Sequence, residues 1–192
     1  MRKAVLSYLH FIWAGLANPA QTGAIVPSQR FLISKMISPV PSGYRGQIVE
    51  IGAGNGALTL RLAARCPQAQ ILACEINPTL ARDSAHHLAA AGLDGRVEVV
   101  SDDAEHVLSE ISRRGRERPG FVISGIPLGT LGRERACALI HRVSRTLGDG
   151  GMYIQFQHSL LGRKPIRVSF PKLRTIPVFL NFPPAVIYYA QK

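Results

Sequence analysis

Short apolar runs alternate with segments whose apolar positions recur every three or four residues over most of the chain. The short runs predict strands buried in a sheet, and the longer period predicts helices that cover the sheet. The expected strands are 47–51, 70–75, 96–101, 121–124, 152–156, 175–180 and 185–189. The expected helices are 31–37, 58–65, 78–91, one that starts around Asp102, and 133–146. This alternation predicts an α/β fold, with a mostly parallel sheet covered on both faces.

Two segments depart from the alternation. The last two apolar runs flank the turn-forming stretch 181–184, which predicts a closing antiparallel pair of strands. The segment 159–171 is short and basic, and its pattern predicts no helix where the alternation would place one.

A glycine-rich turn follows the first predicted strand. Gly52, Gly54 and Gly56 come directly after that strand, and glycine lets a backbone turn sharply or approach a ligand closely. The second predicted strand ends at Glu75, about 20 residues further on, where a carboxylate can accept hydrogen bonds from a ribose diol. Together the two signals predict a site for a cofactor that contains a nucleoside.

Polar residues also follow the third and fourth predicted strands, at Asp102–Asp103 and at Ser124–Leu128. Ligands of parallel α/β sheets bind beyond the carboxyl ends of the strands, which share one edge. We therefore expect the glycine turn, Glu75, Asp103 and 124–128 to meet in one cleft. The two aspartates also have a purely structural interpretation, because acids stabilise the first turn of a helix.

The charge of the chain is strongly positive, with 23 Lys and Arg against 12 Asp and Glu and a formal net charge of +11 at pH 7. No acidic residue follows Gly150, whereas a basic cluster does: Arg163, Lys164, Arg167, Lys172 and Arg174. A field of this sign favours nucleic acid or an acidic membrane surface as a partner. A solvated basic face without a partner is the alternative.

The three cysteines, Cys66, Cys74 and Cys137, are widely spaced. They show no metal-binding spacing, so we expect reduced thiols in a cytosolic protein and no metal.

The N-terminal segment 1–22 begins with Arg2–Lys3 and places apolar residues on one helical face: Val5, Leu9, Ile12 and Leu16. This pattern predicts a short amphipathic helix at a membrane interface, too short to span a bilayer. A helix that packs on its own domain is the alternative.

The end of the fourth predicted strand bears on the substrate. Enzymes that methylate amino groups of nucleic acid carry Asn or Asp there, then Pro, then Pro or Leu, then Tyr or Phe. The amide or carboxylate binds the exocyclic amine and the ring stacks on the base. Here Ser124 stands for the amide and Leu128 for the aromatic residue, so nucleic acid is not expected as the substrate.

Three stretches, 23–28, 124–128 and 180–185, extend a resemblance over nearly the whole chain. With the glycine loop, they are similar to the bacterial phospholipid N-methyltransferases, which are membrane-associated members of the class I S-adenosylmethionine (SAM) methyltransferase superfamily. The resemblance implies a Rossmann-like fold, with a mostly parallel seven-stranded sheet, an antiparallel last strand and helices on both faces. It divides the chain into an N-terminal helix and linker, 1–22, and a SAM-dependent methyltransferase domain, 23–192.

The same resemblance implies stepwise transfer of methyl groups from SAM to phosphatidylethanolamine, which gives phosphatidylcholine through mono- and dimethyl forms. It implies a cytoplasmic enzyme at the inner face of the membrane, with an anionic membrane surface and a phospholipid substrate as its partners. We expect a monomer in solution.

Site residues follow from the resemblance and from the chemistry of amine methylation. Cofactor contacts are expected for Glu50, Gly52, Ala53, Gly54, Gly56, Glu75, Ile76, Asp103, Ala104 and Ser124. Substrate contacts are expected for Ser28, Ile126, Pro127, Arg163 and Arg167, with the arginines on the lipid phosphate. Ser124 is expected to contact the acceptor amine in place of the amide side chain found in nucleic-acid enzymes. The candidate proton acceptors are Tyr44, Tyr153 and His158.

Three alternatives stay open. The first is an rRNA adenine N6-dimethyltransferase, which shares the glycine loop and the basic charge but conflicts with Ser124 and Leu128. The second is a soluble small-molecule N-methyltransferase whose N-terminal helix packs on the fold. The third is a non-catalytic protein that binds SAM or lipid, against which the intact glycine turn, Glu75 and Asp103 argue.

Overall fold

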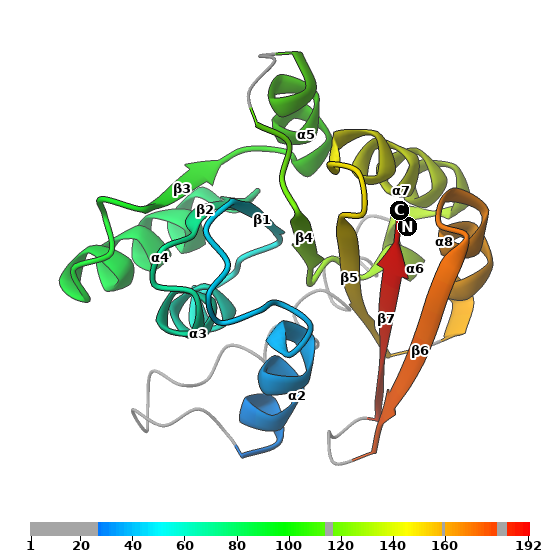
Figure 1. Ribbon diagram of the computed structural model, residues 1–192, viewed down its shortest axis with the longest axis horizontal. Helices are drawn as coiled ribbons and strands as arrows, with labels where there is room; N and C mark the ends of the chain where they lie inside the picture. The colour runs from blue at the N-terminus through cyan, green and yellow to red at the C-terminus, as the bar shows by residue number, and fades with distance from the viewer. Residues whose placement is uncertain (1–26, 114–116, 159, 180–183) are drawn as a thin grey trace.

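The computed structural model describes residues 27–113, 117–158, 160–179 and 184–192. Its centre is one seven-stranded sheet in the order β3-β2-β1-β4-β5-β7-β6 (Figure 1). The strands are β1 (Gln47–Ile51), β2 (Gln70–Glu75), β3 (Val97–Ser101), β4 (Phe121–Ser124), β5 (Met152–Gln157), β6 (Lys172–Val178) and β7 (Ala185–Gln191). Neighbours from β3 to β5 pair in parallel, and β7 runs antiparallel to both β5 and β6. The predicted mostly parallel sheet with an antiparallel last strand is confirmed.

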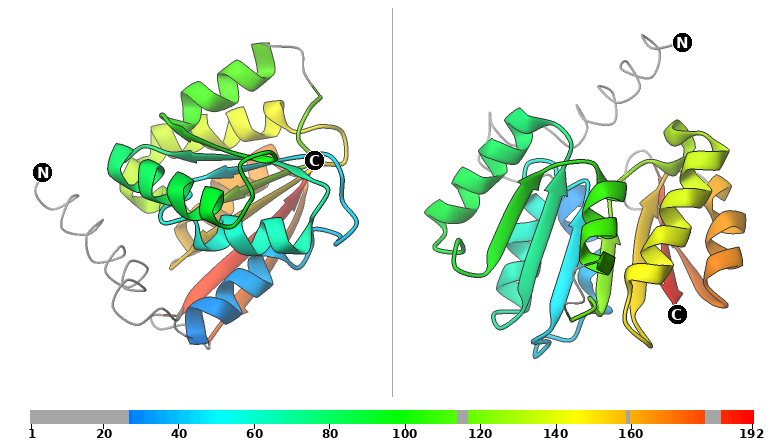
Figure 2. Two further views of the ribbon diagram at one scale, coloured as in Figure 1. Left: turned by 90° about the vertical axis from the view of Figure 1, so that its left-hand side faces the viewer. Right: turned by 90° about the horizontal axis from the view of Figure 1, so that it is seen from above.

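Helices cover both faces of the sheet, as predicted (Figure 2). One hydrophobic cluster joins the sheet to α2 (Pro27–Ile37), α3 (Ala57–Arg65) and α4 (Pro78–Ala90). A second cluster joins its other face to α5 (Ala104–Arg113), α6 (Leu128–Leu131), α7 (Arg133–Thr146) and α8 (Arg163–Ser169). None of the helices in the described ranges is both long and apolar enough to cross a bilayer.

Three short elements are missing from the sequence-based prediction. The segment 159–171, where the pattern predicts no helix, contains the 3-10 turn η1 (Leu160–Gly162) and α8, and α6 follows β4 directly. Elements of three to seven residues are too short to show a helical period. In α8 the buried contacts come from Ile166, together with Phe170 just after the helix.

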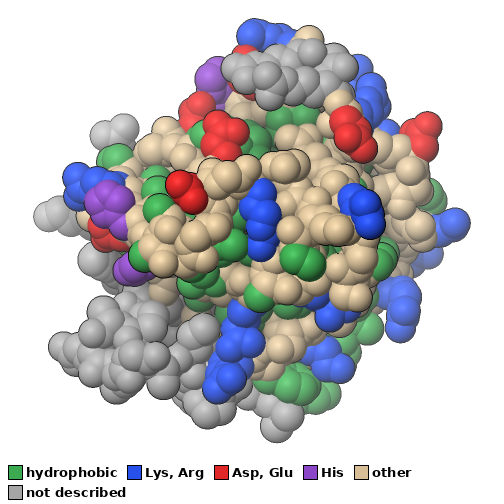
Figure 3. Space-filling view, turned by 60° about the vertical axis from the view of Figure 1, so that its left-hand side comes forward, with side chains coloured by type: hydrophobic (Ala, Val, Ile, Leu, Met, Phe, Trp, Pro, Cys, Tyr) green, Lys and Arg blue, Asp and Glu red, His purple; other side chains and the backbone are tan. Residues whose placement is uncertain are grey.

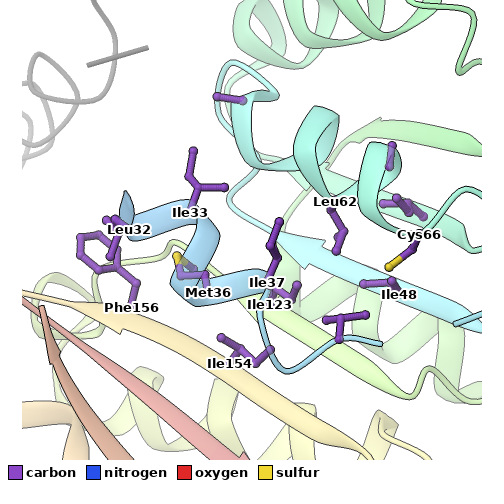
Figure 4. Packing of buried hydrophobic residues seen from close by; sticks show 14 of the residues in the cluster. Leu32, Ile33, Met36, Ile37, Ile48, Leu62, Cys66, Ile123, Ile154 and Phe156 are labelled. Atoms are coloured by element: carbon purple, nitrogen blue, oxygen red, sulfur yellow. The ribbon is translucent and has the colours of Figure 1, made fainter. Parts of the chain in front are cut away.

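Helix α2 lies beside the carboxyl end of β5 and closes one side of the fold. Its apolar side chains, including Leu32, Met36 and Ile37, point toward β-strand residues such as Ile154 and Phe156 (Figure 4). The Tyr189 hydroxyl of β7 also donates to the carbonyl of Lys35 over 2.6 Å. These contacts tie α2 to the sheet at the edge where a ligand is expected.

Candidate active site

A cavity of about 430 Å³ opens at the carboxyl ends of β1, β2 and β4. Its walls come from the glycine turn, the end of β2, the start of α5, the loop after β4, and α2. The predicted site residues that line it are Glu50, Gly52, Ala53, Gly54, Glu75, Ile76, Asp103, Ala104, Ile126 and Pro127. The convergence of four distant stretches in one cleft is therefore observed.

The glycine turn is built from residues with left-handed backbones. Gly52, Gly54 and Gly56 have φ values of 78°, 62° and 79°, a region that side chains disfavour. A Cβ atom at Gly56 would lie 2.5 Å from the Oγ atom of Ser84, and one at Gly52 would lie 3.0 Å from the Ile126 Cγ1 atom. Gly56 therefore shapes the site by allowing α3 and α4 to pack closely, although it does not line the cavity.

Glu75 is fixed by the backbone of the loops around it. Its Oε2 atom accepts a hydrogen bond from the Gly54 N–H over 2.9 Å, and its Oε1 atom accepts one from the Asn77 N–H over 2.9 Å. Each oxygen retains a lone pair for a further donor. A carboxylate held in this way at the end of β2 fits the two hydroxyls of a ribose.

Glu50 is a second carboxyl group on the cavity wall, and it is almost completely buried. Burial raises its pKa to about 8, the hydrogen bond from the Thr59 hydroxyl opposes this rise, and the nearby Glu75 carboxylate adds to it. The Thr59 hydroxyl donates to Glu50 Oε2 over 2.7 Å. At pH 7 this environment thus favours a protonated, neutral Glu50 side chain.

Asp103 stands at the start of α5 and lines the cavity. Its Oδ1 atom accepts a hydrogen bond from the Glu105 N–H over 2.8 Å, which is the capping role that the structural interpretation predicts. Its Oδ2 atom lies 3.9 Å from Arg135 Nη2, and both residues line the cavity. Capping and ligand contact are therefore compatible at this position.

The loop after β4 requires a correction to the sequence-based prediction. Ser124 is completely buried and does not line the cavity, because it lies on the same side of β4 as Val122, which faces the α7 layer. Its hydroxyl accepts a hydrogen bond from the Ile126 N–H over 3.2 Å. Gly125 lines the cavity instead. Counting the four-residue motif back from Leu128 would have placed Gly125 at the amide position.

Two of the candidate proton acceptors lie away from the cavity. Tyr44 precedes β1 and therefore lies at the opposite edge of the sheet, where its hydroxyl donates to the Gln47 carbonyl and accepts from the Gly120 N–H. Tyr153 is fully buried, stacks on Phe170 at 5.7 Å, and donates to Gln155. Burial raises the pKa of both hydroxyls. We drop Tyr44 and Tyr153 as proton acceptors.

His158 and the two arginines lie outside the cavity lining. The His158 ring stands edge-on to Phe156 at 4.8 Å, and its Nδ1 atom donates to the Pro184 carbonyl over 3.2 Å. Arg163 and Arg167 are exposed on α8, four residues apart and so on one helical face. Their contact with a lipid phosphate stays a prediction.

Parts of the prediction fall outside the described residues. These are the N-terminal helix over 1–22, most of the 23–28 stretch, and 180–183. Ser28 belongs to the first turn of α2, and its side chain is not among those described. In the described ranges, no cluster of His, Cys, Asp and Glu side chains could hold a metal ion.

The cavity also contains residues that the sequence-based prediction misses. They include Gln29, Leu32, Ile33 and Met36 of α2, Gly125, Arg135 and Phe156. The α2 residues follow the i, i+3, i+4, i+7 pattern of an amphipathic helix, which predicts burial but does not separate a core from a cavity wall.

A family model described as "Methyltransferase domain" matches residues 48–151. An ornithine lipid N-methyltransferase from Singulisphaera acidiphila is 25% identical over 170 residues, which cover 88% of this chain and 87% of that protein. Ribosomal RNA small subunit methyltransferase C from Salmonella choleraesuis is 29% identical over 119 residues. That match covers 60% of this chain and only 32% of the relative's length.

Among solved structures, a 16S rRNA methyltransferase from T. thermophilus in complex with AdoMet and guanosine gives a TM-score of 0.67 at 23% identity. The match covers 90% of this chain and 45% of that chain. This likeness supports the fold.

Proposed function

The chain belongs to the methyltransferase-domain family, and we propose that this SAM-dependent methyltransferase acts on the amine of a membrane lipid, with phosphatidylethanolamine as the acceptor. The proposal extends to stepwise methylation toward phosphatidylcholine on the cytoplasmic face of the membrane. Similarity to an ornithine lipid N-methyltransferase along most of both chains supports a lipid amine as the substrate class.

The cofactor end of the cavity fits SAM. Glu75 would accept the ribose hydroxyls, and the exposed Ile76 side chain would cover one face of the adenine. Asp103 and Ala104 would contact its edge, while Glu50 and the turn 52–54 would line the methionine part. When bound, SAM supplies an electrophilic methyl group, and the protein's own residues must orient the acceptor and exclude water.

The observation that carries the choice of acceptor is the loop after β4. Gly125 offers no side chain to clamp a nucleobase, and Leu128 is buried in the α7 layer, where it cannot stack on a base. The α2 part of the cavity wall is mostly apolar, with Leu32, Ile33 and Met36 beside the amide of Gln29. Such a site suits a small alkyl amine at the end of a lipid head group.

An apolar wall also helps the chemistry. The amine attacks only when it is neutral, and a primary ammonium with a pKa near 10 is neutral in roughly one molecule in a thousand at pH 7. Transfer from water into an apolar cavity disfavours the charged form and lowers that pKa. The enzyme thereby increases the reactive fraction of the amine.

The surface of the domain is compatible with an anionic membrane as a partner. Three apolar side chains are exposed near the carboxyl end of β5, on α2, η1 and the residue after β6: Phe31, Leu160 (64% exposed) and Phe179 (80%). On the face in Figure 3, the described residues of the lower third show Lys, Arg and hydrophobic side chains and no acidic ones. The predicted amphipathic helix within 1–22 would add to this attachment.

A second candidate function is methylation of ribosomal RNA, which the similarity to Ribosomal RNA small subunit methyltransferase C favours. The experiment that separates the two compares acceptors. Purified full-length enzyme is given SAM with anionic vesicles that contain phosphatidylethanolamine or ornithine lipid, and separately with ribosomal RNA. Mass spectrometry of lipids and of RNA nucleosides should find methylated phosphatidylethanolamine and unchanged RNA. Methylated RNA beside unchanged lipid would contradict the proposal.

A further inference from the structure

The loop after β4 is held by an unusual pair of buried amides. Strand β4 ends at Ser124, which pairs with Gln155, while β5 continues to Gln157. Beyond Ser124 the pairing with β5 ends, although the Gly125 N–H still donates to the Ile51 carbonyl of β1 over 3.1 Å. The carbonyl groups of the loop therefore need other donors. Gln155 and Gln157, whose side chains are 0% and 5% exposed, supply them.

Both amides converge on one oxygen atom. The Gln155 Nε2 atom donates to the Ile126 carbonyl over 3.0 Å, and the Gln157 Nε2 atom donates to the same carbonyl over 2.9 Å. The Gln155 amide is oriented by its other contacts, since its Oε1 atom accepts from the Tyr153 hydroxyl and its Nε2 atom also donates to the Phe156 carbonyl over 2.6 Å. A carbonyl oxygen has two lone pairs, so the Ile126 carbonyl has no capacity left for a substrate.

The other carbonyls of the loop can be assigned in the same way. The Pro127 carbonyl accepts from the N–H and from the hydroxyl of Thr130, over 3.0 and 2.8 Å. The Ser124 carbonyl lies 3.3 Å from Gln155 Nε2. Within the described part of the chain, no group donates to the Gly125 carbonyl, and Gly125 lines the cavity. Gly125 also lies against the glycine turn, since a Cβ there would be 3.2 Å from the Gly52 carbonyl oxygen.

We propose that the Gly125 carbonyl accepts a hydrogen bond from the methyl-acceptor amine, and that Gln155 and Gln157 are positioning residues that fix this carbonyl by holding Ile126. This inference rests on the proposed function, because it concerns an amine as the acceptor. In nucleic-acid methyltransferases an amide side chain at this motif position orients the amine. Here the backbone carbonyl of Gly125, at the same position, would take that role.

The proposal makes the three methyl transfers unequal. The lone pair of a neutral primary amine forms the new bond to the methyl carbon, the carbon–sulfur bond breaks with its electron pair on sulfur, and the product ammonium releases a proton to water. During attack, a primary or monomethyl amine can donate an N–H to the Gly125 carbonyl. A dimethyl amine has no N–H, so the third transfer proceeds without this bond.

The test uses Gln157→Leu, which removes one of the two donors while keeping a buried side chain of similar size. The control is Gln68→Leu, at an exposed position after α3. Full-length wild type and variants are given SAM and vesicles that contain phosphatidylethanolamine, its monomethyl form or its dimethyl form. The measured quantities are kcat and KM for each lipid, KM for SAM, and the melting temperature.

We expect Gln157→Leu to lower kcat for the first two lipids by about tenfold, the size of effect that loss of one orienting hydrogen bond gives. Transfer to the dimethyl lipid should change by less than about twofold on the same reasoning, and KM for SAM should stay unchanged. Gln157→Asn, whose amide is one methylene too short to reach, should show the same selectivity if the Leu variant folds poorly. The Gln68→Leu control should leave all three lipids unaffected.

An equal loss on all three lipids would mean that Gln157 has only a structural role and would overturn the inference. No loss on any of them, or a wild-type third transfer as fast as the first, would overturn it as well. The proposed function is tested separately, by whether the wild-type enzyme methylates the lipids or RNA. Transfer to RNA and to none of the lipids would contradict the proposed function, and the inference would then fall with it.

Discussion

The two ends of the cavity are built on different principles. At the cofactor end, carboxylates are held by neighbouring backbone groups, as Glu75 is by the N–H groups of Gly54 and Asn77. At the proposed acceptor end, the wall comes mostly from apolar residues of α2 and β5, which are far apart in the chain. There, we propose that the backbone of the 125–127 loop binds the acceptor amine in place of a polar side chain.

The two ends therefore depend on different parts of the chain. The cofactor end depends on contacts within and between adjacent loops, so its geometry is inherited with the fold. The acceptor end depends on how a peripheral helix packs over β5, and a change in that helix alters the cavity without disturbing Glu75 or Asp103. Substitutions at the two ends should therefore have separable effects.

Substitution of Glu75 should damage the cofactor end most. Glu75→Ala removes a charged acceptor from the ribose and also frees the Gly54 N–H, so the affinity for S-adenosylhomocysteine should fall by about 2–3 kcal/mol, roughly 30- to 150-fold. Titration calorimetry measures this. Glu98→Ala, at an exposed position on the adjacent strand β3, is the control and should bind normally. Unchanged affinity in Glu75→Ala would place the ribose elsewhere.

The glycine turn should be sensitive to packing as well as to backbone conformation. Gly56 and Gly92 both have positive φ values, 79° and 70°, but only Gly56 has a close neighbour at the Cβ position. Gly56→Ala should therefore lower the free energy of unfolding by about 1–3 kcal/mol more than Gly92→Ala does. Urea denaturation provides both values. Equal destabilisation by the two substitutions would show that the close contact between the new Cβ atom and Ser84 does not lower the free energy of unfolding.

Glu50 should make stability depend on pH. Its folded pKa of about 8 lies above the ordinary value of 4.5, so between these limits the folded state holds a proton that the unfolded state has lost. Protonation of Glu50 in the folded state therefore contributes to the free energy of unfolding. This contribution is fully present below pH 4.5 and is lost as the pH rises through 8.

Glu50→Gln should therefore melt like the wild type near pH 4.5 and at higher temperature near pH 8, by about 2–4 °C for each kcal/mol regained. Thermal melts of the ligand-free protein over this range test the sign, with Glu98→Gln as an exposed control. A difference that shrinks as the pH rises would contradict a raised pKa for Glu50.

The smallest effects should come from the basic surface near the acceptor end. Arg163→Ala and Arg167→Ala should each raise the apparent KM for anionic vesicles by a few fold, on the order of 0.5–1 kcal/mol for a solvated charge. KM for SAM should not change. Arg113→Ala, at the last residue of α5 (Figure 1 shows the helix), is the control for loss of a surface arginine elsewhere on the domain. If the activity on vesicles depends neither on these two arginines nor on salt, the lipid phosphate does not bind at this surface.

Much of the cofactor end could be predicted from the sequence, because its signals are local. Gly52, Gly54, Glu75 and Asp103 each lie at or just after the end of a recognisable strand. Parallel topology brings the ends of such strands together. Tyr44 could have been excluded by the same rule, since it precedes β1 and must lie at the opposite edge.

The acceptor end was harder to predict for two physical reasons. The alternation of side chains along β4 turns Ser124 into the α7 layer and leaves Gly125 at the cavity, a shift of one residue that composition does not reveal. The apolar face of α2 has the same period whether it covers a core or lines a cavity. Only its packing against β5 (Figure 4) separates the two.

The most direct test of the account is a competition for labelled methyl groups in one mixture. Full-length enzyme receives SAM with a radiolabelled methyl group, anionic vesicles with phosphatidylethanolamine, and ribosomal RNA, and the label is counted after extraction into organic and aqueous phases. We predict label in the organic phase as methylated phosphatidylethanolamine, with RNA at the level of an enzyme-free blank. Label confined to RNA would contradict an acceptor end built for a lipid amine.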